Sequence, residues 1–135
     1  MMRTLLACLL GSVALTAPAA AEVRAVLVGV GDYLTLDADL KGPANDVRLM
    51  AETLALRGVD PDLMAVLSTD PSGLPDGVTT NPPTREVILA AMRAASNASA
   101  PGDTLVFYFS GHGAQAPDMS GDEGGGYDEI LLPAD

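Results

Sequence analysis

Apolar residues follow two different periods along the chain. A continuous apolar run at 24–30 is typical of a strand buried on both faces of a parallel sheet, and the segments at 62–68 and 104–110 are expected to form a second and a third strand. Residues 45–57 and the segment that begins at Thr84 instead repeat their apolar positions at helical spacing. The order is strand, helix, strand, helix, strand, and the connections are long enough for parallel pairing. The pattern therefore predicts the α/β class, with a parallel sheet inside a three-layer α/β/α sandwich.

Local signals indicate where these elements end. The apolar stripes consist of Val47, Met50, Ala51 and Leu54 in the first helix and of Ile88, Ala91, Met92 and Ala95 in the second. Gly58 stands just beyond the first helix, where helices commonly end in a glycine. Thr84 is expected to cap the second helix, because a threonine hydroxyl accepts a hydrogen bond from the first turn. Residues 69–83 are rich in proline and glycine and are expected to form a long surface loop.

The first 21 residues have the composition of an export signal. Arg3 gives a positive start, residues 5–17 are mainly apolar, and residues 19–21 form a small-residue cleavage site. The apolar stretch is too short for a stable membrane span. We therefore expect a secretory signal peptide at 1–21 and a mature region at 22–135 that is exported to the periplasm or the extracellular space.

Charge narrows the classes of partner. The chain has 7 basic and 18 acidic residues, which gives a formal net charge of −11. This balance argues against nucleic acid as a partner and favours cationic substrates or metal ions. The one cysteine, Cys8, lies in the expected signal peptide, so the mature region is expected to form no disulfide bond.

The only histidine, His112, follows the third expected strand within the sequence Ser-Gly-His-Gly. Parallel sheets bind ligands beyond the carboxyl ends of their strands, and Asp32 and Tyr33 follow the first strand at the same edge. Imidazole transfers protons near neutral pH, and the flanking glycines let a substrate backbone approach. His112 is therefore either a general base or a hydrogen-bonded turn residue with no catalytic role. A metal centre at His112 is disfavoured, because the mature region has no second histidine and no cysteine.

Two acidic features have more than one interpretation. Residues 115–129 crowd carboxylates among glycines. These carboxylates are Asp118, Asp122, Glu123, Asp128 and Glu129. Like charges at this density suit a hard cation such as calcium, although a solvated acidic loop explains the composition equally well. Asp46, at the start of the first helix, either caps that helix or faces a substrate side chain.

Taken together, these segments resemble the caspase-fold cysteine peptidases, and among them the metacaspases and their bacterial relatives. The similarity is carried by residues 24–33, by the helix entry at 42–50, by the histidine loop at 109–115 and by residues 121–135. The combination of the Ser-Gly-His-Gly loop with the Gly-Asp-Glu and Tyr-Asp-Glu elements is more specific than any single element. The resemblance therefore implies a caspase-like fold over the mature region.

The resemblance also implies a cysteine-type endopeptidase that works through a His-Cys dyad. In this family a cysteine thiolate attacks the peptide carbonyl while the histidine, here His112, protonates the leaving amine. The backbone N–H of Gly113 would help to bind the oxyanion. Asp46 matches an acidic position with which metacaspases hold arginine or lysine, together with Ser110, so we expect cleavage after basic residues. No cofactor is required for this chemistry, but several metacaspases need calcium, and Asp128 matches a ligand-type position in that group.

The expected partner is a peptide or protein substrate, with no nucleic acid and, after signal cleavage, no membrane. In this family the nucleophilic cysteine follows a segment that matches residues 133–135, where the sequence ends. We therefore expect the N-terminal part of a caspase-like domain, incomplete at its C-terminus, that supplies only His112 of the dyad and is inactive alone. The alternative is a non-catalytic caspase-like module for binding or regulation that depends on calcium.

Overall fold

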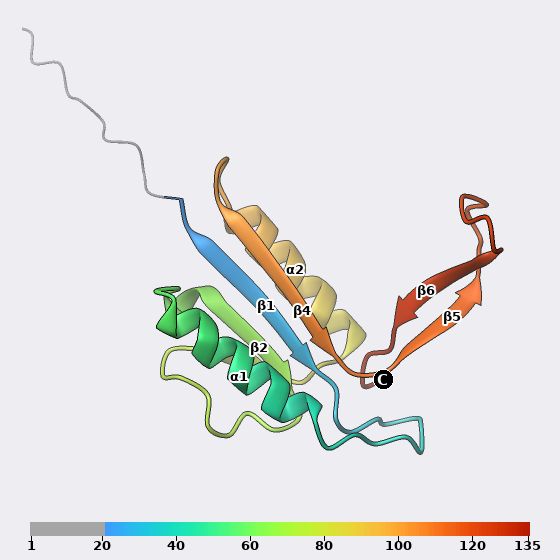
Figure 1. Cartoon of the computed structure of the whole chain (residues 1–135), viewed down its shortest axis with the longest axis horizontal. Helices are drawn as coiled ribbons and strands as arrows, with labels where there is room; N and C mark the ends of the chain where they lie inside the picture. Colours follow the sequence, from blue (N-terminus) through green and yellow to red (C-terminus); the bar gives the residue numbers. More distant parts are fainter. Residues whose placement is uncertain (1–20) are drawn as a thin grey trace, which may run out of the picture.

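The computed structural model describes residues 21–135, so the expected signal peptide lies outside the described residues except for its last residue. A four-stranded sheet with strand order β3-β2-β1-β4 forms the centre, and every neighbouring pair of strands is parallel (Figure 1). The strands are β1 (Val23–Gly29), β2 (Met64–Ser68), β3 (Thr79–Asn81) and β4 (Thr104–Ser110). Helices α1 (Pro43–Leu56) and α2 (Arg85–Ala98) pack on opposite faces of the sheet. The predicted α/β class and three-layer sandwich are confirmed.

The two faces of β1 bury different side chains. Ala25 and Leu27 face α1, where they pack with Val47 of that helix. Val26 and Val28 point to the opposite face, toward α2. All of these strand residues are buried, which explains why β1 is apolar at successive positions rather than at alternate ones. Strand β1 therefore belongs to both hydrophobic cores.

Close packing of β1 against α1 brings the start of this helix to the carboxyl edge of the sheet. A side chain at Gly29 would place its Cβ 2.6 Å from the carbonyl oxygen of Pro43, so only glycine lets the first turn of α1 approach this closely. Gly29 and Ser110, the last residues of β1 and β4, are partners in the register of these strands. The first turn of α1 therefore lies beside the ends of both strands.

The helix ends confirm two local predictions. The Thr84 hydroxyl oxygen caps α2 by accepting a hydrogen bond from the Val87 N–H at 3.4 Å. Gly58 follows α1 with a φ of +88°, in the left-handed region that favours glycine. The apolar stripes predicted for the two helices face the sheet, as the helical spacing indicated.

The expected strand at 62–68 is too long at its start. Residues Pro61–Leu63 form a short 3-10 helix, η1, and β2 begins only after it. Asp60 caps this turn, because its carboxylate accepts a hydrogen bond from the Asp62 N–H at 3.0 Å. Proline also suits the first position of such a turn. Because of these two local signals, residues 61–63 form a helical turn, and the strand begins only at Met64.

The expected surface loop at 69–83 is wrong in part, because it contains β3. Its threonines favour extended backbone, and the strand pairs with β2 at one border of the sheet. Strand β4 forms the other border and is longer, with the Phe107 side chain exposed. The two borders therefore differ in length and in polarity.

Beyond β4 the chain forms an antiparallel hairpin where the sequence indicated an acidic loop. Strands β5 (Gly113–Pro117) and β6 (Tyr127–Leu131) pair along their whole length and project away from the parallel sheet (Figure 1). The side chains of β5 are small or polar, without the apolar alternation that identifies a strand. The tip between them, residues 118–126, is irregular. None of the described helices is long and apolar enough to cross a membrane.

Candidate active site

His112 follows β4 at the carboxyl edge of the sheet. Val30, the residue after β1, donates its N–H to the carbonyl oxygen of Ser110 at 2.9 Å, so the two strands remain paired up to this edge. The β1–α1 loop, residues 30–42, leaves the sheet at the same place. The topology therefore brings His112, this loop and the start of α1 to one edge, as expected for a parallel sheet.

Three contacts from the β1–α1 loop hold His112. The Tyr33 hydroxyl oxygen accepts a hydrogen bond from the backbone N–H of His112 at 2.7 Å. The two rings lie against each other, with centroids 5.2 Å apart and planes tilted by 38°. The carbonyl oxygen of Ala38 lies 2.8 Å from the imidazole Nε2. Both the backbone and the ring of this half-buried histidine are therefore held by the same loop.

The contact with Ala38 assigns the tautomer of the imidazole. A carbonyl oxygen only accepts hydrogen bonds, so Nε2 must carry the proton in this arrangement. In the neutral ring Nδ1 then keeps a free lone pair, and Nδ1 is the atom that can take up and return a proton. The Ala38 carbonyl thus selects which nitrogen of His112 is available for chemistry.

Hydrogen bonds within the β1–α1 loop fix its shape. Leu40 donates its N–H to the carbonyl oxygen of Gly31 at 2.7 Å, which closes the base of the loop. Further along, the Tyr33 N–H donates to Oδ1 of Asp39 at 2.9 Å. These two bonds bring the outgoing and returning halves of the loop together, and Ala38 lies on the returning half next to Asp39.

Asp46 and Ser110 form a second polar pair at this edge. The Ser110 hydroxyl donates to Oδ2 of Asp46 at 2.7 Å, which joins β4 to the first turn of α1. Because α1 has no side-chain cap, the interpretation of Asp46 as a helix cap is wrong. A hollow of about 250 Å³ adjoins Asp46, and its other lining residues are Leu49, Met50, Thr53 and Tyr108. A carboxylate beside apolar side chains suits a ligand with an alkyl stem and a cationic head.

Gly113 begins β5, and the pairing of the hairpin sets the direction of its N–H. Leu132 donates its N–H to the carbonyl oxygen of His112 at 3.0 Å, which continues the hydrogen-bonded positions of the ladder by one bond, since the His112 N–H donates to Tyr33 instead. Bonded and non-bonded pairs alternate along an antiparallel ladder, which places Gly113 opposite Leu131 in a non-bonded pair. The Gly113 N–H therefore points away from β6. The residue as a whole is exposed.

The hairpin tip collects carboxylates at the end of the hairpin remote from His112. One oxygen each of Asp118, Asp122 and Asp128 lies within 4.8 Å of the others. Asp128 stands opposite Ala116 in the register, near the outer end of β5. Carboxylate oxygens are the hard donors that calcium prefers, and these three would supply part of the roughly six to eight ligands that this ion takes.

Asp118 also organises the tip through backbone contacts. Its Oδ1 accepts hydrogen bonds from the N–H groups of Ser120 at 2.9 Å and Gly121 at 2.7 Å, and its Oδ2 accepts one from Glu123 at 3.0 Å. The Gly121 and Glu123 donors stabilise the ionised carboxylate and lower the pKa of Asp118 from its ordinary value. The tip is therefore an ordered turn around one carboxylate.

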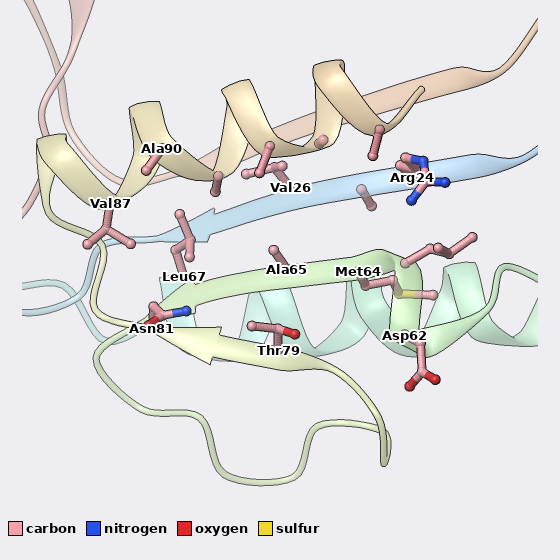
Figure 2. Close-up of a pocket in the computed structure, with 16 residues that line it drawn as sticks. Arg24, Val26, Asp62, Met64, Ala65, Leu67, Thr79, Asn81, Val87 and Ala90 are labelled. Carbon is pink, nitrogen blue, oxygen red and sulfur yellow. The ribbon is translucent and has the colours of Figure 1, made fainter. Parts of the chain in front are cut away.

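A larger hollow, of about 570 Å³, lies between α2 and strands β1 and β2 (Figure 2). Figure 2 shows Val26 and Leu67 along it and Arg24 and Asp62 at one end. None of the candidate residues at the His112 edge lines this hollow. Its walls are mainly apolar and include a row of alanines from α2, so this hollow is separate from the candidate site at His112.

The predicted site residues fall into two groups in the structure. His112 and Gly113 follow the end of β4, and Ser110 joins that end to Asp46. Asp128 belongs to the hairpin tip instead, among the clustered carboxylates. The structure therefore places a candidate proton-transfer group beside a candidate binding pair, and separates both from the candidate calcium ligand.

Three residues around His112 had no predicted role. Tyr33 was expected at this edge because it follows the first strand, but nothing in the sequence linked it to His112. Ala38 acts through its carbonyl oxygen, which has no side-chain signature. Asp39 offers the one local signal, because aspartate side chains often accept backbone hydrogen bonds within loops.

A parallel α/β sandwich with an oriented histidine beyond β4 places this chain in the caspase-like class of domains. The family model described as the metacaspase, peptidase C14 domain matches residues 23–135. The chain therefore belongs to the metacaspase family of cysteine peptidases.

Individual metacaspases show the same relationship. The chain is 38% identical over 112 residues to Metacaspase-1 of Mycosarcoma maydis. Identity and length are the same for Metacaspase-1A of Aspergillus oryzae and Metacaspase-1 of Schizosaccharomyces pombe. Each match covers 83% of this chain but 25% or 26% of the relative. The chain thus spans about a quarter of the length of these curated relatives.

Proposed function

We propose that this chain contributes the histidine half of a cysteine-type endopeptidase that cleaves after arginine or lysine. The observation that carries the proposal is the orientation of His112, whose Nε2 faces the Ala38 carbonyl and whose Nδ1 is left for proton transfer. Membership of the metacaspase family supports the class of reaction. Residues 9–135 contain no cysteine, so the thiol of the dyad comes from outside this stretch.

In the proposed reaction a cysteine thiolate attacks the carbonyl carbon of the peptide bond. The S–C bond forms as the carbonyl oxygen becomes an oxyanion, to which the Gly113 N–H donates. Protonated His112 gives its Nδ1 proton to the amine nitrogen as the C–N bond breaks. Water then hydrolyses the thioester with the neutral imidazole as base, which restores the thiolate and the protonated ring.

Asp46 and Ser110 are the proposed residues for binding the basic side chain of the substrate. The hydrogen bond from Ser110 holds the Asp46 carboxylate in place, and the adjoining hollow offers apolar contacts for an alkyl stem. The formal net charge of −11 would also attract cationic peptides over a longer range. These features support arginine or lysine rather than an acidic residue before the cleaved bond.

Calcium is proposed as an activator and not as a participant in the reaction. Asp118, Asp122 and Asp128 would hold the ion at the hairpin tip, where its charge would offset the repulsion among these carboxylates. We further propose that residues 1–21 direct export, so that peptide or protein substrates are met in the periplasm or outside the cell. Neither nucleic acid nor a membrane has a part in this proposal.

The test uses this chain joined to a cysteine-bearing segment encoded after codon 135, with fluorogenic peptides that end in arginine, lysine or aspartate. We expect cleavage of the first two, and a loss of roughly 100-fold or more for His112→Ala. Asp46→Asn should lower kcat/KM for arginine peptides, whereas Asp32→Asn, at an exposed carboxylate of the same edge, should not. The assay is run with calcium and with a chelator to test activation.

Several outcomes would contradict the proposal. A preference for aspartate peptides would overturn the specificity, and an inactive protein with an intact thiol would overturn the peptidase assignment. The chain as given, residues 1–135, should be inactive in the same assay. A stop codon after codon 135 would favour a calcium-dependent binding module, a candidate supported by the absence of cysteine from residues 9–135. Such a module would bind calcium in a titration without cleaving any peptide.

A further inference from the structure

We propose that Asp39 is a positioning residue, whose carboxylate closes the β1–α1 loop so that the Ala38 carbonyl holds the His112 ring. The inference rests on the proposed function, because it concerns how His112 is oriented for proton transfer. Asp39 is not assigned a contact with the substrate or with the reacting atoms. It acts through Tyr33 and Ala38, the two residues of the β1–α1 loop that form hydrogen bonds with the histidine.

The first step of the argument is the geometry of the loop. The Tyr33 N–H donates to Oδ1 of Asp39 at 2.9 Å, a side-chain bond that spans six positions. At the base, the Leu40 N–H donates to the Gly31 carbonyl oxygen at 2.7 Å. Asp39 therefore lies between this backbone closure and Ala38. Fixing Asp39 on both sides restricts the peptide unit whose oxygen faces Nε2 of His112.

The second step is the double role of Tyr33. Its backbone N–H bonds to Asp39, while its hydroxyl oxygen accepts the His112 N–H at 2.7 Å and its ring packs against the imidazole. The same hydrogen bond thus links both halves of the loop that contact His112. Its loss would loosen the ring contact of Tyr33 and the Ala38 carbonyl together.

The third step is that apolar packing does little to hold the outer part of this loop. Leu34 is 75% exposed and Leu36 is 44% exposed, so neither anchors the loop in the core. Among the acids of the loop, Asp32, Asp37 and Asp39, only Asp39 accepts a hydrogen bond within the part of the chain that the structure describes. The Asp39 closure therefore restrains the outer part of the loop, together with the buried ring of Tyr33 and the hydrogen bond from the Leu34 N–H to the Ala134 carbonyl oxygen at 2.7 Å.

The test reads the imidazole directly by NMR on the ¹⁵N-labelled full chain. His112 is the only histidine, so one Nε2–H signal reports on the site. In the parent chain we expect the Nε2–H tautomer, with this proton protected from water. Asp39→Ala should speed its exchange roughly fivefold and raise the share of the Nδ1–H tautomer, as for the loss of one hydrogen bond. Asp39→Asn should restore the parent behaviour, because its amide oxygen accepts the same N–H.

Asp37→Ala is the matched control, because it removes an equal charge from the same exposed loop. Unchanged exchange and tautomer in Asp39→Ala would overturn the proposal. The proposal would equally be overturned if Asp37→Ala had the same effect, or if Asp39→Asn behaved like Asp39→Ala. Retention of the β1 amide signals in each variant confirms that the sheet is intact. The readout needs neither a thiol nor a substrate, so its failure is distinguishable from failure of the peptidase assay.

Discussion

The surroundings of His112 and the hairpin tip are both polar and partly exposed, but hydrogen bonds of very different sequence range hold them. We call Tyr33, Ala38 and Asp39 the histidine cradle. Tyr33 and Ala38 reach His112 across 79 and 74 positions of the sequence. At the tip, Asp118 reaches the backbone of residues two, three and five positions away. One arrangement is made by the whole fold and the other by a single turn.

This difference determines when each arrangement can exist. The cradle meets His112 only after β1 and β4 have paired, since the loop and the histidine follow these two strands. Bringing the β1–α1 loop and His112 together costs conformational entropy, because many residues separate them in the sequence. Packing of the hydrophobic core must offset this cost before the cradle can form. The Asp118 turn closes only a few residues, so it can form with little help from the rest of the molecule. Proton transfer and ion binding would therefore respond to different perturbations.

The largest expected effect comes from breaking the fold beneath the cradle. Leu27→Ala leaves a cavity in the α1 face of β1, where Leu27 is fully buried, and should lower the free energy of unfolding by about 2–5 kcal/mol. Urea denaturation measures the change. Leu56→Ala, at a leucine that is 89% exposed, is the control and should change stability by less than about 0.5 kcal/mol. An equal loss in both variants would contradict the central position of β1.

A smaller effect comes from the cradle itself. Tyr33→Phe keeps the ring but removes the oxygen that accepts the His112 N–H, so the free energy of unfolding should fall by about 1–2 kcal/mol. Tyr127→Phe removes a hydroxyl from the exposed hairpin strand β6 and should change stability by less than about 0.5 kcal/mol. Thermal unfolding of both variants gives the comparison. If the two hydroxyls proved equivalent, the cradle would not hold His112 as described.

The most local effect is the response of the hairpin tip to acid. The pKa of Asp118 is lowered in the folded chain, chiefly by the Gly121 and Glu123 N–H groups, so its carboxylate stabilises the turn above the ordinary aspartate range. This contribution is lost as the pH falls below about 3.9 and through the lowered pKa. The Ser120 and Gly121 amide signals should therefore shift in that acid window. Asp118→Asn, which cannot titrate, should abolish this transition, and its persistence would assign the transition to another acid.

Three strands of the sheet and its two helices could be predicted because their apolar residues leave a pattern in the sequence, whereas the short and exposed β3 leaves none. Strand β1 is buried on both faces, so its residues are apolar in succession, and the helices show stripes because each has one buried face. Strand β5 leaves no such mark, because its Gly-Ala-Gln-Ala-Pro sequence is stabilised by backbone pairing with β6 and not by a core. Burial can be deduced from one segment, whereas pairing depends on two.

The same distinction applies to the candidate site. His112 could be identified from its side chain, its flanking glycines and its position after a strand. The pairing of Ser110 with Asp46 agrees with the expectation that both lie at one binding edge, although their roles stay predictions. The Ala38 carbonyl and the direction of the Gly113 N–H depend on backbone geometry, which any residue type could supply. Sequence patterns therefore identify the groups that react. They say much less about the groups that orient them.

Because the two edge strands of the sheet differ, a further strand would pair more readily at one edge than at the other. Strand β3 is short and polar and all three of its residues are exposed, whereas β4 offers seven residues that, within the described chain, are paired on one side only, with β1. The unpaired backbone N–H and C=O groups along an edge strand of that length can pair with an extended segment of any polypeptide. At high concentration, self-association of this chain would therefore begin at the free edge of β4, the strand that His112 follows.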